Sequence, residues 1–259
     1  MTIKGLLAHT AADTKNTGVV GPIFDDLRFE FIPIKISTRY TRHTYSSIPA
    51  KNKEYGTWLS DFLSPNLAEK QAHSDPDFRN CTFGQPNNRS TKVLALQKLL
   101  EGDYLFFLAS LVPYSQSVYR GNRYFLKSYQ KGKKNKYIFG FFKVKGVANI
   151  NIAPYLAGQS EDNRIDIELK SGSITKEIIK TNEHYKSSFP FTLIVGHKDQ
   201  SCRLEKAVQL TERQGKGSFI LNNLGRRIRG RKTDTLMGVR WLNEVAVNQI
   251  LEEIKRVNT

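Results

Sequence analysis

The chain has few cysteines, and none lies in a metal-binding pattern. Cys81 and Cys202 are the only two among its 259 residues, and no Cys-x-x-Cys pair occurs. A cysteine-based zinc site is therefore excluded, because such sites need closely spaced pairs. One disulfide between these two residues stays open, but the cysteine usage favours two reduced thiols in a cytoplasmic protein.

Long apolar runs and cofactor motifs are also missing. No stretch approaches about 18 consecutive apolar residues, and the N-terminus lacks the apolar core of a secretory signal, so we expect neither a membrane span nor export. GxGxxG, GxSxG and GxxxxGK followed by Ser or Thr are absent, as is HxE with a downstream PCxxC. These absences argue against nucleotide hydrolysis, dinucleotide redox chemistry and zinc deamination, and we expect no cofactor.

What the chain has in excess is positive charge. Forty Lys and Arg face 24 Asp and Glu, which gives a formal net charge of +16. Two clusters stand out, one within KSYQKGKKNK (127–136) and one within GRRIRGRK (225–232), and their glycines predict loops. Neither has an apolar face at helical spacing, so nucleic acid is the expected polyanionic partner rather than a membrane.

The pattern of apolar residues predicts a mixed α+β fold in one domain over residues 1–259. We expect a mixed or antiparallel sheet with peripheral helices and long basic loops. Residues 35–90 read as irregular, and a loop region of that length usually carries function. The predicted strands are 2–9, 27–34, 103–112, 136–147, 164–170 and 191–197, and the predicted helices are 91–100, 174–185, 202–210 and 241–257.

Two segments concentrate groups suited to acid–base chemistry. His73, Asp75 and Asp77 place an imidazole and two carboxylates within five residues, where Pro76 disfavours a helix. Asp13 lies in a loop with glycines, which let a backbone approach a ligand closely. Each segment also fits a simple turn, because Asp and Pro favour turns.

A third pattern suggests a different chemistry. Asp166, Glu168 and Lys170 alternate on a predicted strand and so share one face. In metal-dependent nucleases such a set holds Mg²⁺ while the Lys supports the attacking water. A charged strand facing solvent gives the same pattern.

A series of short blocks resembles a known family. They are DTKNTGVVGPI (13–23), HTY (43–45), HSDPDF (73–78), TFG (82–84), GDYLFF (102–107), YIFGFFKV (137–144), GHKDQSCRLEKA (196–207) and GVRWL (238–242). Their order resembles that of the nucleotide-modification-associated domain family, third type, over most of the chain. Gln85 departs from the pattern, since an acidic residue is expected there. The resemblance implies an association with modified DNA bases, without settling the chemistry.

A second likeness concerns 102–111 and 137–144, which are similar to the hairpin of EVE and PUA-like barrels. Those barrels bind flipped, modified bases, so the likeness implies a barrel-like core and an aromatic base pocket, although an ordinary buried hairpin reads the same way. The residues expected to contact base or DNA are Thr14, Asn16, Gly18, Tyr45, Phe83, Arg89, Lys131, Lys133, Lys134, Arg203, Lys206, Arg226, Arg227, Arg229 and Arg231. Arg203 and Lys206 are placed on one face of the predicted helix 202–210.

Three functions remain open. The favoured one is a DNA glycosylase that flips out a modified base and hydrolyses its N-glycosidic bond, with Asp13, Asp75 or Asp77 as the carboxylate and His73 assisting. The second is a non-catalytic reader of modified bases. The third is a modification-dependent nuclease using Asp166, Glu168 and Lys170. A role in defence against phages with hypermodified DNA would follow from the first or the third.

Overall fold

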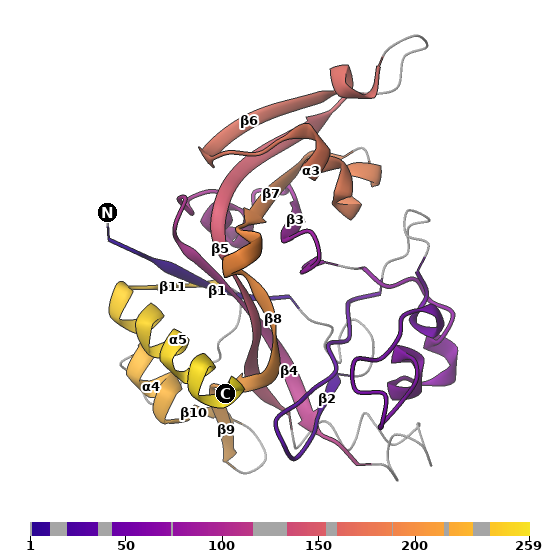
Figure 1. Cartoon of the computed structure of the whole chain (residues 1–259), viewed down its shortest axis with the longest axis vertical. Coiled ribbons are helices and arrows are strands. Elements are labelled where there is room, and N and C mark those ends of the chain that lie inside the picture. Colours follow the sequence, from indigo (N-terminus) through magenta and orange to yellow (C-terminus); the bar gives the residue numbers. More distant parts are fainter. Residues whose placement is uncertain are drawn as a thin grey trace.

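A computed structural model of the chain describes residues 2–10, 20–35, 43–73, 75–115, 134–153, 160–187, 189–214, 218–229 and 239–259. Within these ranges nine strands form one mixed sheet (Figure 1), in which the path β11-β1-β4-β5-β7-β3 is joined by β2, β6 and β8. The strands are β1 (Gly5–His9), β2 (Gly21–Ile23), β3 (Thr82–Pro86), β4 (Tyr104–Pro113), β5 (Asn135–Ile152), β6 (Ile165–Gly172), β7 (Phe191–Gly196), β8 (Cys202–Gln209) and β11 (Val239–Leu242). A separate hairpin pairs β9 (Thr211–Gln214) with β10 (Ser218–Leu221).

The helices lie around this sheet. They are α1 (Thr91–Leu96), α3 (Lys176–Thr181), α4 (Asn223–Arg229) and α5 (Glu244–Asn258), together with the 3-10 turns η1 (Tyr45–Ser47), η2 (Leu59–Phe62), η3 (Pro65–Leu67), η6 (Glu161–Arg164), η7 (Glu183–Ser187) and η8 (Lys198–Gln200). In the part of the chain that is described, no helix combines the length and apolar composition needed to cross a bilayer.

The long strand β5 makes the sheet curl into a half-barrel. Its first half pairs with β4 and β8, and its second half pairs with β6 and β7. The register shifts near Gly140 and again near Gly146, and such bulges bend a strand and increase its twist. The two halves of the sheet therefore face different ways, and aromatic residues of β4 and β5 pack together in one hydrophobic cluster.

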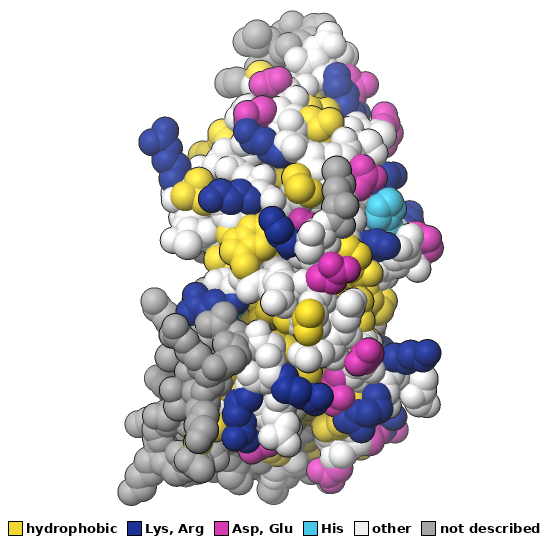
Figure 2. All heavy atoms as spheres, turned by 90° about the vertical axis from the view of Figure 1, so that its left-hand side faces the viewer, with side chains coloured by type: hydrophobic (Ala, Val, Ile, Leu, Met, Phe, Trp, Pro, Cys, Tyr) yellow, Lys and Arg dark blue, Asp and Glu magenta, His cyan; other side chains and the backbone are white. Residues whose placement is uncertain are grey.

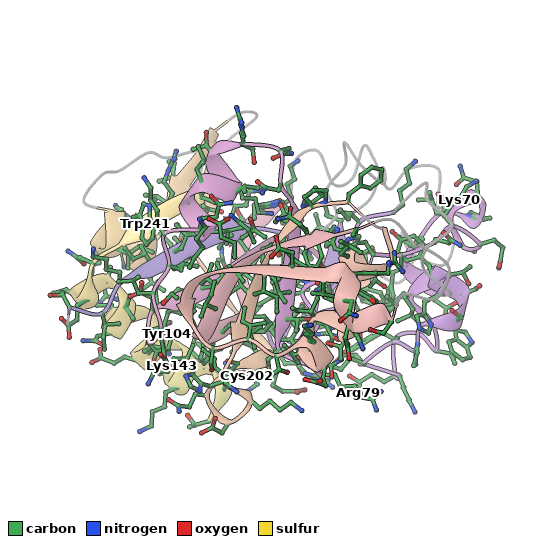
Figure 3. All side chains as sticks on the ribbon, turned by 90° about the horizontal axis from the view of Figure 1, so that it is seen from above. Lys70, Arg79, Tyr104, Lys143, Cys202 and Trp241 are labelled. Carbon is green, nitrogen blue, oxygen red and sulfur yellow. The ribbon has the colours of Figure 1, made fainter. Side chains whose placement is uncertain are left out.

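The predicted mixed α+β fold is confirmed, and several elements lie where the pattern placed them. Strands β1, β4, β6 and β7 match their predicted ranges, and β4 pairs antiparallel with β5 as the hairpin likeness implied. Tyr104 and Lys143 face each other across that pair, with the ammonium 5.9 Å from the ring centroid (Figure 3). The hydroxyl of Ser90 accepts from the amide of Val93, which caps α1 as expected.

Other predictions were wrong. Residues 27–34 make only isolated bridges, because β2 and β8 touch them at single positions and Pro33 offers no amide hydrogen. The predicted helix 202–210 does not form, because residues Cys202–Gln209 are strand β8, which pairs antiparallel with β5. The predicted helix 174–185 breaks at Asn182 into α3 and η7.

Two assignments of basic residues and one of a tryptophan also change. Arg226 and Arg227 lie on α4 rather than in a loop. Lys136 is buried in β5, where its ammonium donates to the Ser110 hydroxyl at 2.7 Å, so it is not part of a solvated basic run. Trp241 belongs to β11, because α5 begins only after Asn243, whose side chain accepts from the amide of Ala246.

Candidate functional site

The segment 73–78 lies between a buried polar cluster and an open pocket. Its start is tied to the preceding chain by the amide of His73, which donates to the Ile34 carbonyl at 2.9 Å. Its end is a tight turn in which Asp77 and Thr82 exchange backbone hydrogen bonds of 2.9 and 3.0 Å. The peptide between Asp75 and Pro76 is cis. His73 and Asp75 thus belong to the buried cluster, whereas Pro76, Asp77 and Phe78 line the pocket.

The buried side holds Asp75, His73 and His184. The two imidazoles approach through their Nε2 atoms at 3.1 Å, and Nε2 of His184 lies 3.3 Å from Oδ2 of Asp75. Asp75 is 4% exposed. These three residues come from two parts of the chain that are more than a hundred positions apart, and β3 lies between them in sequence.

Backbone and amide groups orient the carboxylate of Asp75. The amide of Gly84 donates to Oδ2 at 3.1 Å, and the side-chain amide of Asn182 donates to Oδ1 at the same distance. Asn182 also donates to the hydroxyl of Thr82 and accepts from the amide of His184. A single buried side chain at the end of α3 therefore aligns the two halves of the cluster.

Burial and neighbouring charges shift the pKa values of His73 and Lys92. Burial lowers the pKa of His73, with Asp75 opposing and His184 adding to the shift, so His73 is neutral at pH 7. Burial also lowers the pKa of Lys92 to about 8, again against the pull of Asp75. The ammonium of Lys92 donates to the His9 carbonyl at 3.3 Å and lies 5.0 Å from the ring centroid of Phe83. A titratable lysine thus lies near the cluster at the end of β1.

Gly84 is the position where the cluster tolerates no side chain. A Cβ there would lie 2.4 Å from Cδ2 of His184 and 2.6 Å from Oδ1 of Asn182. Gly84→Ala is therefore expected to lower the free energy of unfolding by about 1–3 kcal/mol, the usual cost of overpacking. Urea denaturation measures this loss.

The control for that prediction is Gln85→Ala on the same strand. The side chain of Gln85 is half-buried and donates to the Gly84 carbonyl, so its loss should cost about 1 kcal/mol or less. Equal stabilities of the two variants would show that β3 can move away from His184, and the close fit would then have no energetic meaning.

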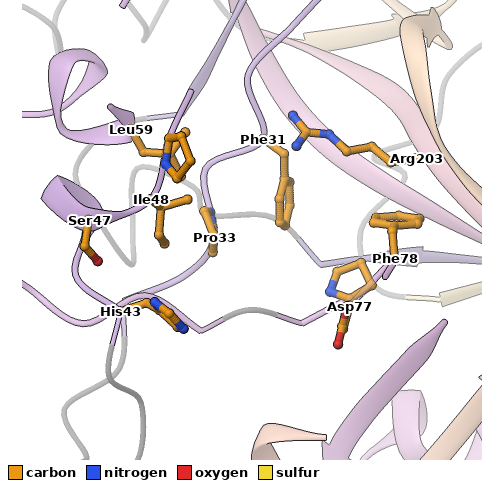
Figure 4. A pocket seen from close by; sticks show the side chains of 11 residues that line it. Phe31, Pro33, His43, Ser47, Ile48, Leu59, Asp77, Phe78 and Arg203 are labelled. Atoms are coloured by element: carbon orange, nitrogen blue, oxygen red, sulfur yellow. The ribbon is translucent and has the colours of Figure 1, made fainter. Parts of the chain in front are cut away.

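The open side of the segment is a pocket of about 410 Å³ (Figure 4). Phe31, Phe78 and the guanidinium of Arg203 form one wall, and Pro33, Ile48 and Leu59 lie opposite. Phe31 stacks on Phe139 with a centroid distance of 4.5 Å, which fixes its ring. Pro76 and Asp77 continue this lining directly from Asp75. The volume lies within the range of about 300–1,000 Å³ that small-molecule sites occupy.

Arg203 reaches this wall from β8, and few polar groups lie close to its guanidinium. Its Nη2 lies 3.6 Å from Oε2 of the fully buried Glu30, and its guanidinium carbon lies 5.3 Å from the centroid of Phe29. Its Nε and Nη2 atoms are buried without a hydrogen bond. Burial lowers the pKa of Arg203 against the opposing charge of Glu30. A pocket ligand can therefore reach the guanidinium only through the part of the side chain that stays exposed, which is 27% of its surface.

The candidate catalytic residues fall in different places. His73 and Asp75 lie in the buried cluster, whereas Asp77 lines the pocket, where its carboxylate accepts from the amides of Arg79 and Asn80. Asp13 lies outside the described residues, as do Thr14, Asn16, Gly18, Lys131, Lys133 and Arg231.

The two aromatic candidates are buried. Tyr45 is 0% exposed and its hydroxyl donates to the Pro33 carbonyl at 2.7 Å, while Phe83 is 2% exposed between Phe107 and Lys92. Neither ring therefore has an exposed face on which a base could stack. Phe31 and Phe78, which the sequence analysis did not single out, line the pocket instead.

The candidate basic contacts are dispersed. Arg226 and Arg227 are exposed on α4, which packs against α5 away from the pocket, and Arg229 ends that helix. The helical face on which Arg203 and Lys206 were expected does not exist, because both residues lie on strand β8. Lys134 directly precedes β5, and Arg89 lies exposed before α1 with a φ of 56°. On the face in Figure 2, basic side chains alternate with acidic ones.

The alternative nuclease set lies on the exposed strand β6. Lys170 pairs with Glu168, whose other oxygen accepts from Asn149 at 2.8 Å, and Asp166 is exposed beside Asn151. The hydrogen bond from Lys170 lowers the pKa of Glu168. Within the described ranges, the residues grouped closely enough to hold one metal ion are His73, Asp75 and His184.

A comparison with family models matches residues 4–244 to nucleotide modification associated domain 3. The chain belongs to this family. The match spans β1 to the first residue of α5 and so includes both the buried cluster and the pocket. Membership is consistent with a role that involves modified nucleotides. No curated protein and no solved structure matches the chain.

Sequence reasoning missed His184, Asn182 and Lys92. All three lie in segments that were read simply as helices, and no local spacing marks them as partners of His73 and Asp75. Their role depends on the fold, which brings η7 and α1 against β3.

Proposed function

We propose that this family member is a DNA glycosylase that excises a modified base. The carrying observation is the pocket on the open side of segment 73–78, where aromatic and guanidinium groups meet a carboxylate. An extruded base would stack on Phe31 and Phe78, and stacking on aromatic rings contributes about 1–3 kcal/mol per base. Arg203 would donate to acceptor groups of that base.

Asp77 is the carboxylate that fits the chemistry. It lines the pocket together with Phe31 and Phe78, so a nucleotide whose base stacks on those rings would bring its sugar within reach of the carboxylate. Cleavage of an N-glycosidic bond builds positive charge on the sugar, and a nearby carboxylate stabilises that charge and orients water. Asp75 is 4% exposed, accepts from Gly84 and Asn182 and does not line the pocket, so we assign it to positioning rather than to contact with the sugar.

The basic surplus of the chain supports DNA as the partner. A formal charge of +16 favours a polyanion, and binding should weaken as salt increases, because phosphate contacts release counterions. The family assignment points the same way, towards modified nucleotides. The nuclease alternative is less well supported, because Lys170 is already paired with Glu168.

The test is an incubation of the protein with DNA that carries ordinary, hydroxymethylated or glucosylated cytosines. Mass spectrometry detects released base, and alkali treatment reveals abasic sites as strand breaks. We expect free modified base and alkali-labile sites. Intact DNA that is nevertheless bound with preference for one modification would replace this proposal by the reader. Strand breaks that form without alkali would replace it by the nuclease.

A further inference from the structure

Three side-chain atoms that can bind a metal ion converge in the buried cluster. Nε2 of His73 lies 3.1 Å from Nε2 of His184, which in turn lies 3.3 Å from Oδ2 of Asp75. His73 and Asp75 are buried and His184 is half-buried. Among the described residues, these three form the group of His, Cys, Asp and Glu side chains close enough to share one ion.

One cation placed between the two imidazoles and the carboxylate would accept a lone pair from each of the three. Binding through Nε2 puts the hydrogen of His73 on Nδ1, towards Oε2 of Glu183 at 3.8 Å, and gives up the 3.3 Å contact from the amide of Asp75.

Two of the separations between the ligand atoms match the coordination sphere of one metal ion. Two ligand atoms at about 2.0–2.1 Å from a tetrahedral zinc ion lie about 3.3–3.4 Å apart. The observed distances are 3.1 Å between the two imidazole nitrogens and 3.3 Å from His184 to Asp75, and all three ligand atoms lie within 4.8 Å of one another. We propose that His73, His184 and Asp75 bind one divalent transition-metal ion of the zinc class.

The surroundings of the three residues are those of a metal site. Ligands in such sites are held by further hydrogen bonds that fix their orientation. Gly84 and Asn182 hold the two oxygens of Asp75, and Oε2 of Glu183 lies 3.8 Å from Nδ1 of His73. Side chains of His73 and His184 keep 11% of their surface exposed, which leaves an entry path.

The ligand set selects the class of metal and leaves coordination incomplete. Two imidazoles and one carboxylate suit zinc, cobalt or iron, whereas Mg²⁺ and Ca²⁺ prefer sites made of oxygen. Three protein ligands leave at least one position for water, as in catalytic rather than structural zinc sites. This inference does not rest on the proposed glycosylase, because none of the three ligands lines the pocket.

The experiment strips the full-length protein with a chelator and titrates it with Zn²⁺ and Co²⁺. We expect one equivalent of Zn²⁺ to bind in competition with a chromophoric chelator, and Co²⁺ to give the visible absorption of a low-coordinate site. His184→Ala should weaken binding by about 100-fold or more, since removal even of an outer partner costs 10–100-fold. His197→Ala, which changes a histidine outside the cluster, should bind as the wild type does.

Two further measurements keep the proposal testable if His184→Ala does not fold. His73→Gln keeps the size of the side chain and should also lose the Co²⁺ spectrum while it retains the wild-type circular dichroism. Zn²⁺ should raise the Tm of the wild type and leave that of His73→Gln unchanged. No binding by the folded wild type, or equal binding by His73→Gln, would overturn the site.

The same preparations separate this site from the proposed function. Metal binding without release of any base would leave the site standing and overturn the glycosylase. Release of base by metal-free protein that binds no zinc would do the reverse.

Discussion

Asp77→Asn is expected to slow release of a modified base by about 10²–10⁴-fold, the range that a positioned acid or base usually contributes. The substitution removes the negative charge from the pocket wall. It keeps one side-chain oxygen to accept from the amides of Arg79 and Asn80, so the turn should survive. The hydrogen bond that is lost is the one from the Asn80 side-chain amide to the other carboxylate oxygen, at 2.7 Å. Single-turnover release of free base measures the effect.

The matched control is Asp61→Asn. Asp61 also accepts from two backbone amides, those of Thr57 and Trp58, but it does not line the pocket. Its variant should release base at the wild-type rate. The affinity of Asp77→Asn for DNA should stay close to that of the wild type, because its contribution concerns the transition state rather than the ground state. An unchanged rate in Asp77→Asn would move the catalytic carboxylate to another residue.

The second large effect concerns stability. Glu30 is fully buried, accepts from the backbone and side-chain amides of Asn52 at 2.5 and 2.7 Å, and lies opposite Arg203. Glu30→Ala would leave the guanidinium without its counter-charge, and removal of one partner of a buried pair costs about 3–5 kcal/mol. We expect about 3 kcal/mol, because the Arg203 side chain keeps 27% of its surface exposed.

Glu205→Ala is the control for this prediction. Glu205 lies on β8 close to Arg203 and pairs with Lys51, but its side chain is 56% exposed. Exposed pairs contribute about 0–1 kcal/mol, so little stability should be lost. Urea denaturation of both variants gives the two free energies of unfolding. If both variants lose the same amount, the Glu30–Arg203 contact is no stronger than a surface pair.

The Glu30–Arg203 pair also links stability to the pocket. Arg203 is both the partner of Glu30 and part of the pocket wall, so a variant that loosens it should bind the extruded base more weakly. The guanidinium in the pocket wall is therefore held by Glu30, a carboxylate that does not itself line the pocket.

Some features followed from the sequence because local chemistry decides them. Strand β4 consists of consecutive apolar residues that are buried on both faces, and α5 carries Val247, Ile250 and Ile254 at helical spacing. The Ser90 cap and the position of β7 follow from equally local signals. The positive charge and the family could also be read from the residues alone.

Other features depended on contacts between distant segments. CRLEKAVQL has a composition that suits a short helix, but pairing with β5 makes it strand β8, so the expected helical face of Arg203 and Lys206 does not form. Phe83 is buried in the core and Phe78 lines the pocket, and neither TFG nor HSDPDF contains a local pattern that predicts this difference. The partner of His73 lies 111 residues away, so only the folded chain could bring His184 to it. Sequence therefore determined which side chains are available, and the curl of the sheet decided which of them meet.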